Sequence, residues 1–406
     1  MAQKSIFIFF LFIVFSCSKT DVFEEPIIEP TIIPKEKCVD GFAGEYPCKD
    51  YDLISQIPNS DFFGAGTEGN DSWGWFDETT GKEYAIMGTT KGTGFVDITN
   101  PTKPIILGTL ATATEINLWR DIKVYKNFAF IVSEAIGHGM QVFDLEKLRL
   151  VTNPPEIFTA DANYTEFGNA HNIVINENSG FAYAVGTKTF AGGPHFVDVT
   201  NPATPKSAGG YSAAAYSHDA QVVTYSGPDA DYTGKEILIG SNENEVVIVD
   251  VTDKANPVQI SNIDYANIGY THQGWFTEDQ RFFILGDELD EIRFGGNSRT
   301  LIFDFADLEN PTFSFEYLGK TTAIDHNGYV KGNLFYQANY TAGIRIIDIS
   351  TIGNKSIKEV GFFDTYPEND NAAFNGTWSV YPYLPSGNII VSDINRGLFI
   401  IRKSGS

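Results

Sequence analysis

The 406-residue sequence predicts an all-β fold, a seven-bladed β-propeller of four-stranded antiparallel blades whose ring is closed by an N-terminal strand. Three observations lead to this prediction. Glycine (38), phenylalanine (32) and tyrosine (19) are abundant and methionine is scarce (3), a composition that favours strands over helices. The apolar runs are short and are separated by turn residues. Two sequence markers recur about every fifty residues, which is the length of one four-stranded blade.

The chain begins with a segment typical of a bacterial lipoprotein signal. A positive residue precedes an apolar run at residues 6–15, which is too short to span a bilayer, and a serine then precedes Cys17. We expect a signal peptide at residues 1–16, an acylated cysteine and tether at residues 17–37, and the propeller at residues 38–405. Acylation of Cys17 would anchor the protein to a bacterial membrane, the outer membrane, facing the periplasm or the exterior. An ordinary signal peptide with an incidental cysteine is the alternative.

Charge and cysteine content limit the partners and the compartment. The 52 acidic residues outnumber the 28 basic ones, and the resulting formal charge of −24 repels phosphate backbones and anionic headgroups. Nucleic acid is therefore excluded as a partner, and we expect membrane contact only through the N-terminal lipid. Export to an oxidising compartment favours a disulfide between Cys38 and Cys48. Zinc binding by these two thiols is the weaker interpretation, because no histidine lies near them in the sequence.

Each repeat starts with a marker residue, followed by three apolar runs and a Pro-containing connection into a fourth run. The last repeat has only three runs, and residues Leu53–Ile57 resemble the missing one, so we expect this segment to close the ring. The marker residues, spaced by 47 to 54 residues, are Trp73, Arg120, His171, His218, His272, His326 and Trp378.

A second marker, an aspartate at the end of the third run, recurs in six repeats. A carboxylate at this position can accept backbone N–H groups of the following turn, so we interpret these residues as structural. They are Asp97, Asp144, Asp198, Asp250, Asp304 and Asp348.

The repeated blocks also resemble a known family, the choice-of-anchor B family, whose blades belong to the LVIVD-repeat class. The resemblance covers residues 38–401 and implies a propeller fold and an extracytoplasmic location, with a lipoprotein signal as one of several alternative anchors. It implies no particular activity. Its carriers include CVDGFAGEYPC, WGWFD, WRDIKVY, HGMQVFDL, AHNIVIN, SHDAQVV, VVIVDV, THQGWFTED, LGDELDE, DHNGYV, NYTAGIRIIDIS and WSVYPYLPSGNIIVSDINRGLFII.

Four of the six histidines are marker residues of consecutive repeats. Equivalent positions of a propeller form a ring, so we expect these imidazoles at one mouth of the channel, together with carboxylates at the ends of the second strands. Imidazoles with carboxylates suit Zn²⁺, Mn²⁺ or Fe²⁺, and the acidic run at residues 287–291 is a candidate for Ca²⁺. The candidate metal ligands are His171, His218, His272 and His326, and the candidate ligand-binding residues are Arg120, Glu134, Glu243, Asp287, Glu288 and Asp393.

Together these features predict a surface-anchored propeller that binds a small-molecule, glycan or protein ligand at this mouth, through a divalent metal and without turnover. A metal-dependent hydrolase or lyase with Glu243, Glu288 or Glu134 as general base is one alternative. A protein-interaction scaffold, in which the histidines only tie neighbouring blades together and the acidic run is only solvated, is the other. Catalysis has no motif to support it, because the sequence contains no G-x-S-x-G, H-E-x-x-H, P-loop or C-x-x-C pattern.

Overall fold

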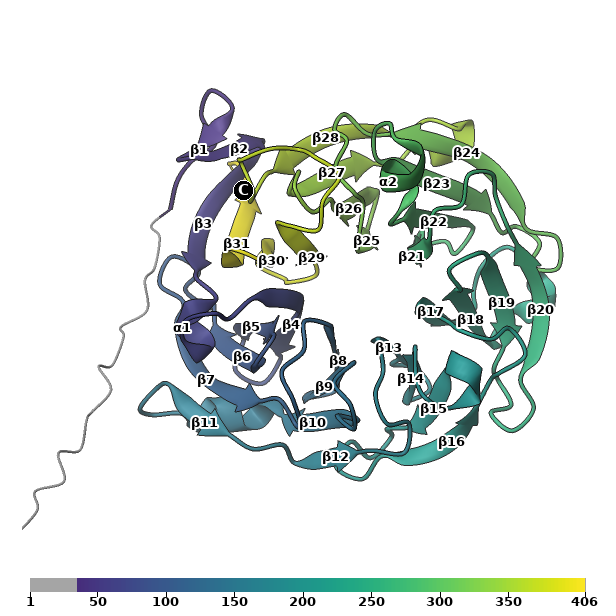
Figure 1. Cartoon of the computed structure of the whole chain (residues 1–406), viewed down its shortest axis with the longest axis horizontal. Coiled ribbons are helices and arrows are strands. Elements are labelled where there is room, and N and C mark those ends of the chain that lie inside the picture. The colour runs from purple at the N-terminus through teal and green to yellow at the C-terminus, as the bar shows by residue number, and fades with distance from the viewer. Residues whose placement is uncertain (1–34, 406) are drawn as a thin grey trace, which may run out of the picture.

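The computed structural model describes residues 35–405, which form a ring of seven β-sheets around a central channel (Figure 1). The predicted seven-bladed β-propeller is thereby confirmed. The predicted signal peptide, Cys17 and the tether up to residue 34 lie outside the described residues. None of the helices in residues 35–405 is long and apolar enough to cross a membrane.

In blades 1 to 4 the strands follow one another from the channel outward (Figure 1). Blade 1 contains β4 (Gly69–Asp77), β5 (Lys82–Thr89), β6 (Gly92–Asp97) and β7 (Ile105–Ala111). Blade 2 contains β8 (Arg120–Tyr125), β9 (Phe128–Ser133), β10 (Met140–Asp144) and β12 (Ala162–Tyr164). Blade 3 contains β13 (Asn172–Asn176), β14 (Phe181–Val185), β15 (His195–Asp198) and β16 (Lys206–Gly210). Blade 4 contains β17 (Asp219–Thr224), β18 (Glu236–Ser241), β19 (Val246–Asp250) and β20 (Val258–Ile263).

Blades 5 and 6 repeat this order, and blade 7 takes its outermost strand from the N-terminal part of the chain. Blade 5 contains β21 (Thr271–Phe276), β22 (Phe282–Asp287), β23 (Arg299–Asp304) and β24 (Thr312–Leu318). Blade 6 contains β25 (Gly328–Lys331), β26 (Leu334–Ala338), β27 (Ile344–Asp348) and β28 (Lys358–Phe363). Blade 7 contains β29 (Thr377–Tyr381), β30 (Asn388–Asp393), β31 (Gly397–Lys403) and β3 (Tyr51–Ile57).

Two blades carry strands beyond the predicted four. A short segment of the chain between β10 and β12 of blade 2 forms β11 (Glu156–Phe158), which pairs in parallel with β7 of blade 1. The hairpin of β1 (Phe42–Ala43) and β2 (Tyr46–Lys49) extends blade 6 through β28 and is closed by the predicted disulfide between Cys38 and Cys48. The described helices are all short: α1 (Ser60–Phe63), α2 (Asp290–Phe294), η1 (Leu145–Leu150), η2 (Phe190–Gly192), η3 (Ala230–Tyr232) and η4 (Ile352–Asn354).

The ring closes through the pairing of the two ends of the propeller. β3 is antiparallel to β31, with Leu53 opposite Ile401, and Figure 1 shows the N-terminal strand beside the C-terminal one. Leu53 is fully buried. The expected closing strand is therefore confirmed. All seven residues of β3 are buried, because blade 6 and the N-terminal hairpin attached to that blade pack beside this strand.

The middle strands are buried on both faces because each blade packs between two others. In β19 four consecutive apolar residues are buried, whereas in the outer strand β20 no residue is fully buried. Burial of both faces explains why the third strand of a repeat appears in the sequence as a continuous apolar run and not as alternating apolar and polar residues. The aspartates that end the third strands each accept the backbone N–H two residues later, at 2.9–3.0 Å, as predicted; they are Asp97, Asp144, Asp198, Asp250, Asp304 and Asp348.

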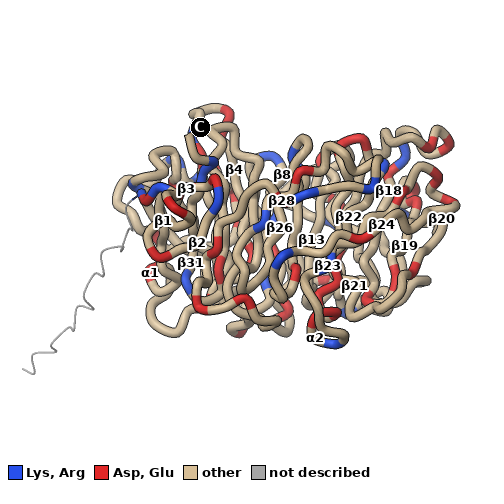
Figure 2. Tube along the Cα trace, turned by 90° about the horizontal axis from the view of Figure 1, so that it is seen from above, with Lys and Arg blue, Asp and Glu red and all other residues tan. Residues whose placement is uncertain are grey.

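Acidic side chains are distributed over the whole ring, which Figure 2 shows edge-on. They are dense around α2, which follows β22 and protrudes from one face. The part of the chain after β22 also contains Glu288, so the protruding helix marks the face of the ring on which the candidate site lies.

Candidate functional site

The inner strands place their side chains in three levels along the channel. Hydrogen bonds between blades fix the equivalence: the carboxylate of Asp71 accepts the N–H of Ile122 at 3.0 Å, and that of Asp121 accepts the N–H of Ile173 at 2.9 Å. The histidine level, at one mouth, consists of Asn70, Arg120, His171, His218, His272, His326 and Trp378. The polar level below it consists of Asp71, Asp121, Asn172, Asp219, Gln273, Asn327 and Ser379. The aromatic level, towards the other mouth, consists of Trp73, Lys123, Val174, Gln221, Trp275, Tyr329 and Tyr381.

The prediction that Trp73 belongs to the histidine level is wrong. β4 has an irregular register at residues 69–72, and these extra residues make Asn70 the equivalent of the histidines. Trp73 therefore lies at the aromatic level, where its ring centroid is 4.9 Å from that of Tyr381 and 5.5 Å from that of Tyr329. The marker residue Trp73 has the right period but stands three residues further into its strand than Asn70.

The four marker histidines form a continuous arc. Ring centroids are 4.0 Å apart between His171 and His218, 4.7 Å between His218 and His272, and 4.5 Å between His272 and His326. The arc ends at Trp378, whose ring centroid is 5.0 Å from that of His326. Residues about fifty positions apart in the sequence are thus in side-chain contact.

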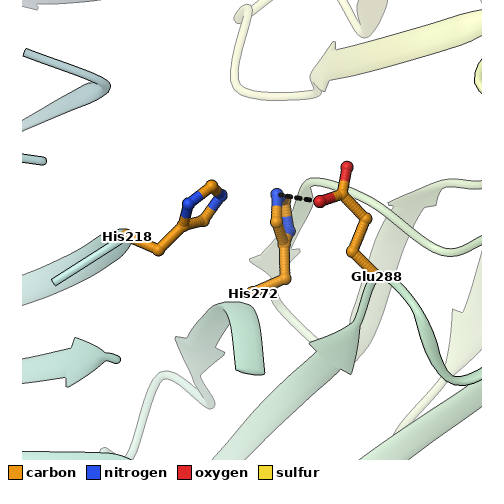
Figure 3. A group of neighbouring side chains, drawn as sticks. All are labelled: His218, His272 and Glu288. Atoms are coloured by element: carbon orange, nitrogen blue, oxygen red, sulfur yellow. Dashed lines mark ion pairs between the residues drawn. The ribbon is translucent and has the colours of Figure 1, made fainter. Parts of the chain in front are cut away.

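Within this arc, His218, His272 and Glu288 form a group that could hold a metal ion. One ligand atom from each lies within 4.8 Å of the others, and both imidazoles are buried. Figure 3 shows the two rings next to one another, with the carboxylate beside His272. The Nε2 atom of His272 is 3.7 Å from Glu288, and that of His326 is 3.5 Å from the same carboxylate. Glu288 is therefore the point on which the histidines converge.

Hydrogen bonds to neighbouring blades orient these side chains. The Nδ1–H of His326 donates to the carbonyl of Trp378 at 2.5 Å, and because a carbonyl only accepts, the neutral ring carries its lone pair on Nε2. The Nδ1 of His218 is 2.9 Å from the hydroxyl of Tyr270, and its Nε2 has no hydrogen-bond partner. The hydroxyl of Tyr340 donates to Glu288 at 2.8 Å. The sequence reasoning missed both tyrosines, because their hydroxyls come from adjacent blades and no spacing connects them to the histidines.

Burial dominates the protonation of the site. It lowers the pKa of His218 and His272 well below the usual value, and that of His326 to about 3. Burial also raises the pKa of Glu288 to about 7, although the Tyr340 hydroxyl acts against this shift. The three imidazoles are consequently neutral at physiological pH, which is the form that coordinates metals.

The remaining candidate residues of this mouth divide into two groups. Glu134 joins the histidine arc, because its carboxylate lies 2.7 Å from Nδ1 of His171. Burial lowers the pKa of His171, but the hydrogen bond and charge of Glu134 together with the charges of Glu288 and Asp219 outweigh it, so that the pKa is raised. Arg120 does not face the arc: its guanidinium is 3.0 Å from Nε2 of His138 and donates to the carbonyl of Thr89 at 3.1 Å.

Asp287 and Asp393 also make internal contacts. Asp287 accepts the N–H groups of Gly269 and Tyr270 at 2.7 and 2.5 Å, and Asp393 accepts three bonds from its own turn and from blade 7's entry loop. Glu243 has a positive φ of 66° and its N–H donates to the carbonyl of Thr271 at 3.2 Å. The structure thus brings Glu134 and Glu288 to the imidazoles, and leaves Asp287 and Asp393 in turn-forming roles.

The polar level connects the blades and does not orient the imidazoles. The amide of Asn172 donates to the carboxylate of Asp219 at 2.8 Å, and Gln273 accepts the N–H of Gly328 at 2.9 Å. The residues that follow the histidines in the sequence thus tie neighbouring blades together one level deeper in the channel. A cavity of only about 10 Å³ remains between the two levels, which is the size of a single water.

The fold and this mouth define the class of the protein, a seven-bladed β-propeller with a histidine- and carboxylate-lined channel mouth. Residues 234–264 match the family model described as the LVIVD repeat. The match spans β18, β19 and β20 of blade 4, including the run VVIVD at the third strand. The chain is thus a propeller that contains an LVIVD repeat. A search of curated protein sequences finds no match.

Solved structures support the fold alone. A protein of unknown function from Desulfotomaculum acetoxidans superposes with a TM-score of 0.53 at 11% identity, covering 80% of this chain and 95% of that one. A protein from Lactobacillus plantarum gives 0.51 at 13% identity, covering 80% and 87%. The β-propeller domain of Cps50 (Swd1) from Myceliophteria thermophila gives 0.50 at 11% identity, covering 83% and 99%. At these identities the likeness carries no function.

Proposed function

We propose that this protein is a binding propeller that holds a divalent transition metal at His218, His272 and Glu288 and binds its ligand through that metal. One observation carries the proposal: the convergence of these three ligand atoms within 4.8 Å at the mouth of the channel. A buried polar atom normally has a hydrogen-bond partner, and the buried Nε2 of His218 has none among the described residues.

The tautomer of His326 supports a cation between the imidazoles and the carboxylate. Its Nε2 lone pair faces Glu288 at 3.5 Å, so two acceptors oppose each other unless the carboxyl is protonated or a cation lies between them. A metal ion satisfies both acceptors at once. The imidazole nitrogens suit Zn²⁺, Mn²⁺ or Fe²⁺, whereas Ca²⁺ prefers oxygen donors, so Ca²⁺ is the least suitable of the four candidates.

Hydrogen bonds from outside the group fit this role. Metal-bound histidines usually donate their second ring N–H to a fixed acceptor, and the hydroxyl of Tyr270 lies where His218 would use it. Two imidazoles and one carboxylate leave at least one coordination position open. A small-molecule, glycan or protein ligand with an oxygen donor would occupy that position from the mouth of the channel.

The metal content of the purified protein tests this proposal. We expect about one equivalent of a divalent transition metal, and its loss in His218→Gln and in Glu288→Gln, because each variant removes one of three ligands. His195→Gln is the matched control, since His195 is equally buried but bonds to Tyr164 outside the site. Unchanged metal content in both site variants, or no metal in the wild-type protein after reconstitution with Zn²⁺, Mn²⁺ and Fe²⁺, contradicts the proposal.

A metal-dependent hydrolase or lyase is the second candidate, and the bond between Glu134 and His171 favours it. This pair lies next to the metal group, with the ring of His171 4.0 Å from that of His218. A carboxylate held by an imidazole beside an ion is a suitable proton acceptor. Turnover of ester, phosphoester and polyol substrates by the metal-loaded protein, abolished in Glu134→Gln with metal retained, would favour catalysis over binding.

We further propose that acylation of Cys17 anchors the propeller to the outer membrane of a bacterium. The lipoprotein-type signal and the disulfide-containing N-terminal hairpin support this location. Replacing Cys17 by alanine should release the protein from the membrane fraction and abolish metabolic labelling with palmitate. Protease treatment of intact cells would then distinguish exposure at the cell surface from exposure to the periplasm.

A further inference from the structure

A cavity of about 450 Å³ opens at the channel mouth opposite the histidine level. This volume is in the range of small-molecule sites, about 300–1,000 Å³. The polar level separates it from the histidines, and the space remaining there is about 10 Å³. The cavity is therefore distinct from the proposed metal site, and nothing argued so far uses it.

Five aromatic rings form a continuous arc at this end of the channel, and all of them except the buried Tyr329 line the cavity. The ring of Tyr329 lies 4.9 Å from that of Trp275 and 5.5 Å from that of Trp73, measured between centroids. Trp73 is in turn 4.9 Å from Tyr381, which is 5.3 Å from Tyr383. Four different blades supply these rings, so the arc exists only in the closed propeller. Indole and phenol faces are electron-rich, and they attract cations.

The charges around the cavity also favour a cation. Lys123 is the one basic residue among those that line it, and its ammonium lies 2.8 Å from Asp121 and 3.9 Å from Asp71, so it is already neutralised. Glu177 and Glu278 line the cavity as well, and both are exposed. The cavity thus presents uncompensated negative charge, which disfavours an anionic ligand.

The walls offer few free hydrogen-bonding groups. Much of the remaining lining is aliphatic, as at Val174, Val222 and Val330. The hydroxyl of Tyr383 already donates to a backbone carbonyl at 2.9 Å, and the Oε1 of Gln221 already accepts a backbone N–H at 2.8 Å. A sugar would leave several hydroxyl groups unpaired here, at a cost of about 1–3 kcal/mol each. A methylated ammonium has no such groups and needs only apolar contact and negative charge.

We propose that this aromatic mouth is a second binding site of the propeller and that it takes an organic cation with a methylated ammonium head. The aromatic arc would surround the methyl groups, and the carboxylates of Glu177 and Glu278 would balance the charge at the entrance. The proposal does not depend on the metal site.

Calorimetric titration of the purified protein with choline and with 3,3-dimethylbutan-1-ol tests the inference. The two molecules have nearly the same shape, but only choline is charged. We expect choline to bind about tenfold more tightly, and its affinity to fall severalfold when the salt concentration is raised to 1 M. Equal affinities, tighter binding of glucose than of choline, or no choline binding at tens of millimolar would each overturn the proposal.

Variants distinguish choline binding in this cavity from unspecific attraction of choline to an acidic protein. Trp275→Leu and the double variant Glu177→Gln/Glu278→Gln should each weaken choline binding about fivefold or more. Glu166→Gln, which removes an exposed carboxylate that does not line the cavity, should leave it unchanged. If Trp275→Leu does not fold, as judged by circular dichroism, the double variant Glu177→Gln/Glu278→Gln still tests the proposal. Unchanged affinity in the carboxylate variant, or an equal loss in Glu166→Gln, contradicts the proposed site.

Discussion

Lys123 is the counter-charge of two buried carboxylates, so its removal should destabilise the propeller strongly. Its ammonium lies 2.8 Å and 2.9 Å from the two carboxylate oxygens of Asp121 and 3.9 Å from Asp71, and the side chains of all three residues are at most 7% exposed. Lys123→Met leaves both carboxylates buried without a counter-charge. Breaking a buried ion pair in this way costs about 3–5 kcal/mol of the free energy of unfolding.

Guanidinium and thermal unfolding, followed by tryptophan fluorescence, measure this loss. For a domain of this size the same free energy lowers Tm by about 4–6 °C. Lys188→Met is the matched control, since Lys188 is exposed and its loss should change stability by less than about 0.5 kcal/mol. Adding Asp121→Asn to Lys123→Met should restore part of the loss. A loss of less than about 1 kcal/mol in Lys123→Met would refute the reasoning that these charges depend on one another.

Three further predictions concern stability. Arg149 holds Asp77 with two bonds of 2.7 Å, and this lowers the pKa of Asp77 to about 2, so Arg149→Met should lower the free energy of unfolding near neutral pH. A carboxylate whose pKa is lower in the folded protein stabilises the fold at pH values above its unfolded pKa, which is near 3.8 for Asp77. The difference in stability between wild type and Arg149→Met should therefore shrink as the pH falls from about 4 towards 2. A difference in stability that does not change over this pH range would contradict the assignment. Leu53→Ala should cost about 2–5 kcal/mol because Leu53 is fully buried where the ring closes, whereas Val258→Ala, at a residue 60% exposed in β20, should cost far less; equal losses in chemical denaturation would argue against closure by β3. Reduction of the disulfide should remove about 2–3 kcal/mol, and a Tm that does not respond to reductant would show that the hairpin is independent of the ring.

Much of the fold follows from the sequence because the propeller is periodic. The six aspartates of the third strands repeat with the blades, and their role as turn acceptors depends on residues two positions away, so local reasoning suffices. The closing strand could also be predicted, since one repeat lacked a fourth run and one N-terminal segment, Leu53–Ile57, matched it. The extra strands β1, β2 and β11 could not be, because they pair with whichever outer edge is left exposed beside them.

The candidate site was predictable only in part. The period of the histidines indicates their shared level, and the up-and-down course of a blade indicates that Glu134 and Glu288 reach the same mouth. The period of the repeat does not determine, however, how far along the channel a side chain lies. Because of the irregular start of β4, Trp73 lies at the aromatic level and not at the expected histidine level. The partners of the imidazoles and of Glu288 were also out of reach, since Tyr270 bonds to His218 and Tyr340 to Glu288, each from 52 residues away.

By itself, then, the sequence determined the number of blades, their strand order, the closure of the ring and the set of histidines that share one level. These properties depend on hydrophobic pattern, turn residues and repetition, all of which are local or periodic. The tertiary structure alone decided which atoms of that level converge, how Lys123 is neutralised below it, and that four aromatic rings from three blades line the cavity at the opposite mouth. Those features depend on side-chain register and direction within a closed ring, where a shift of one residue sends a side chain to the other face of its strand.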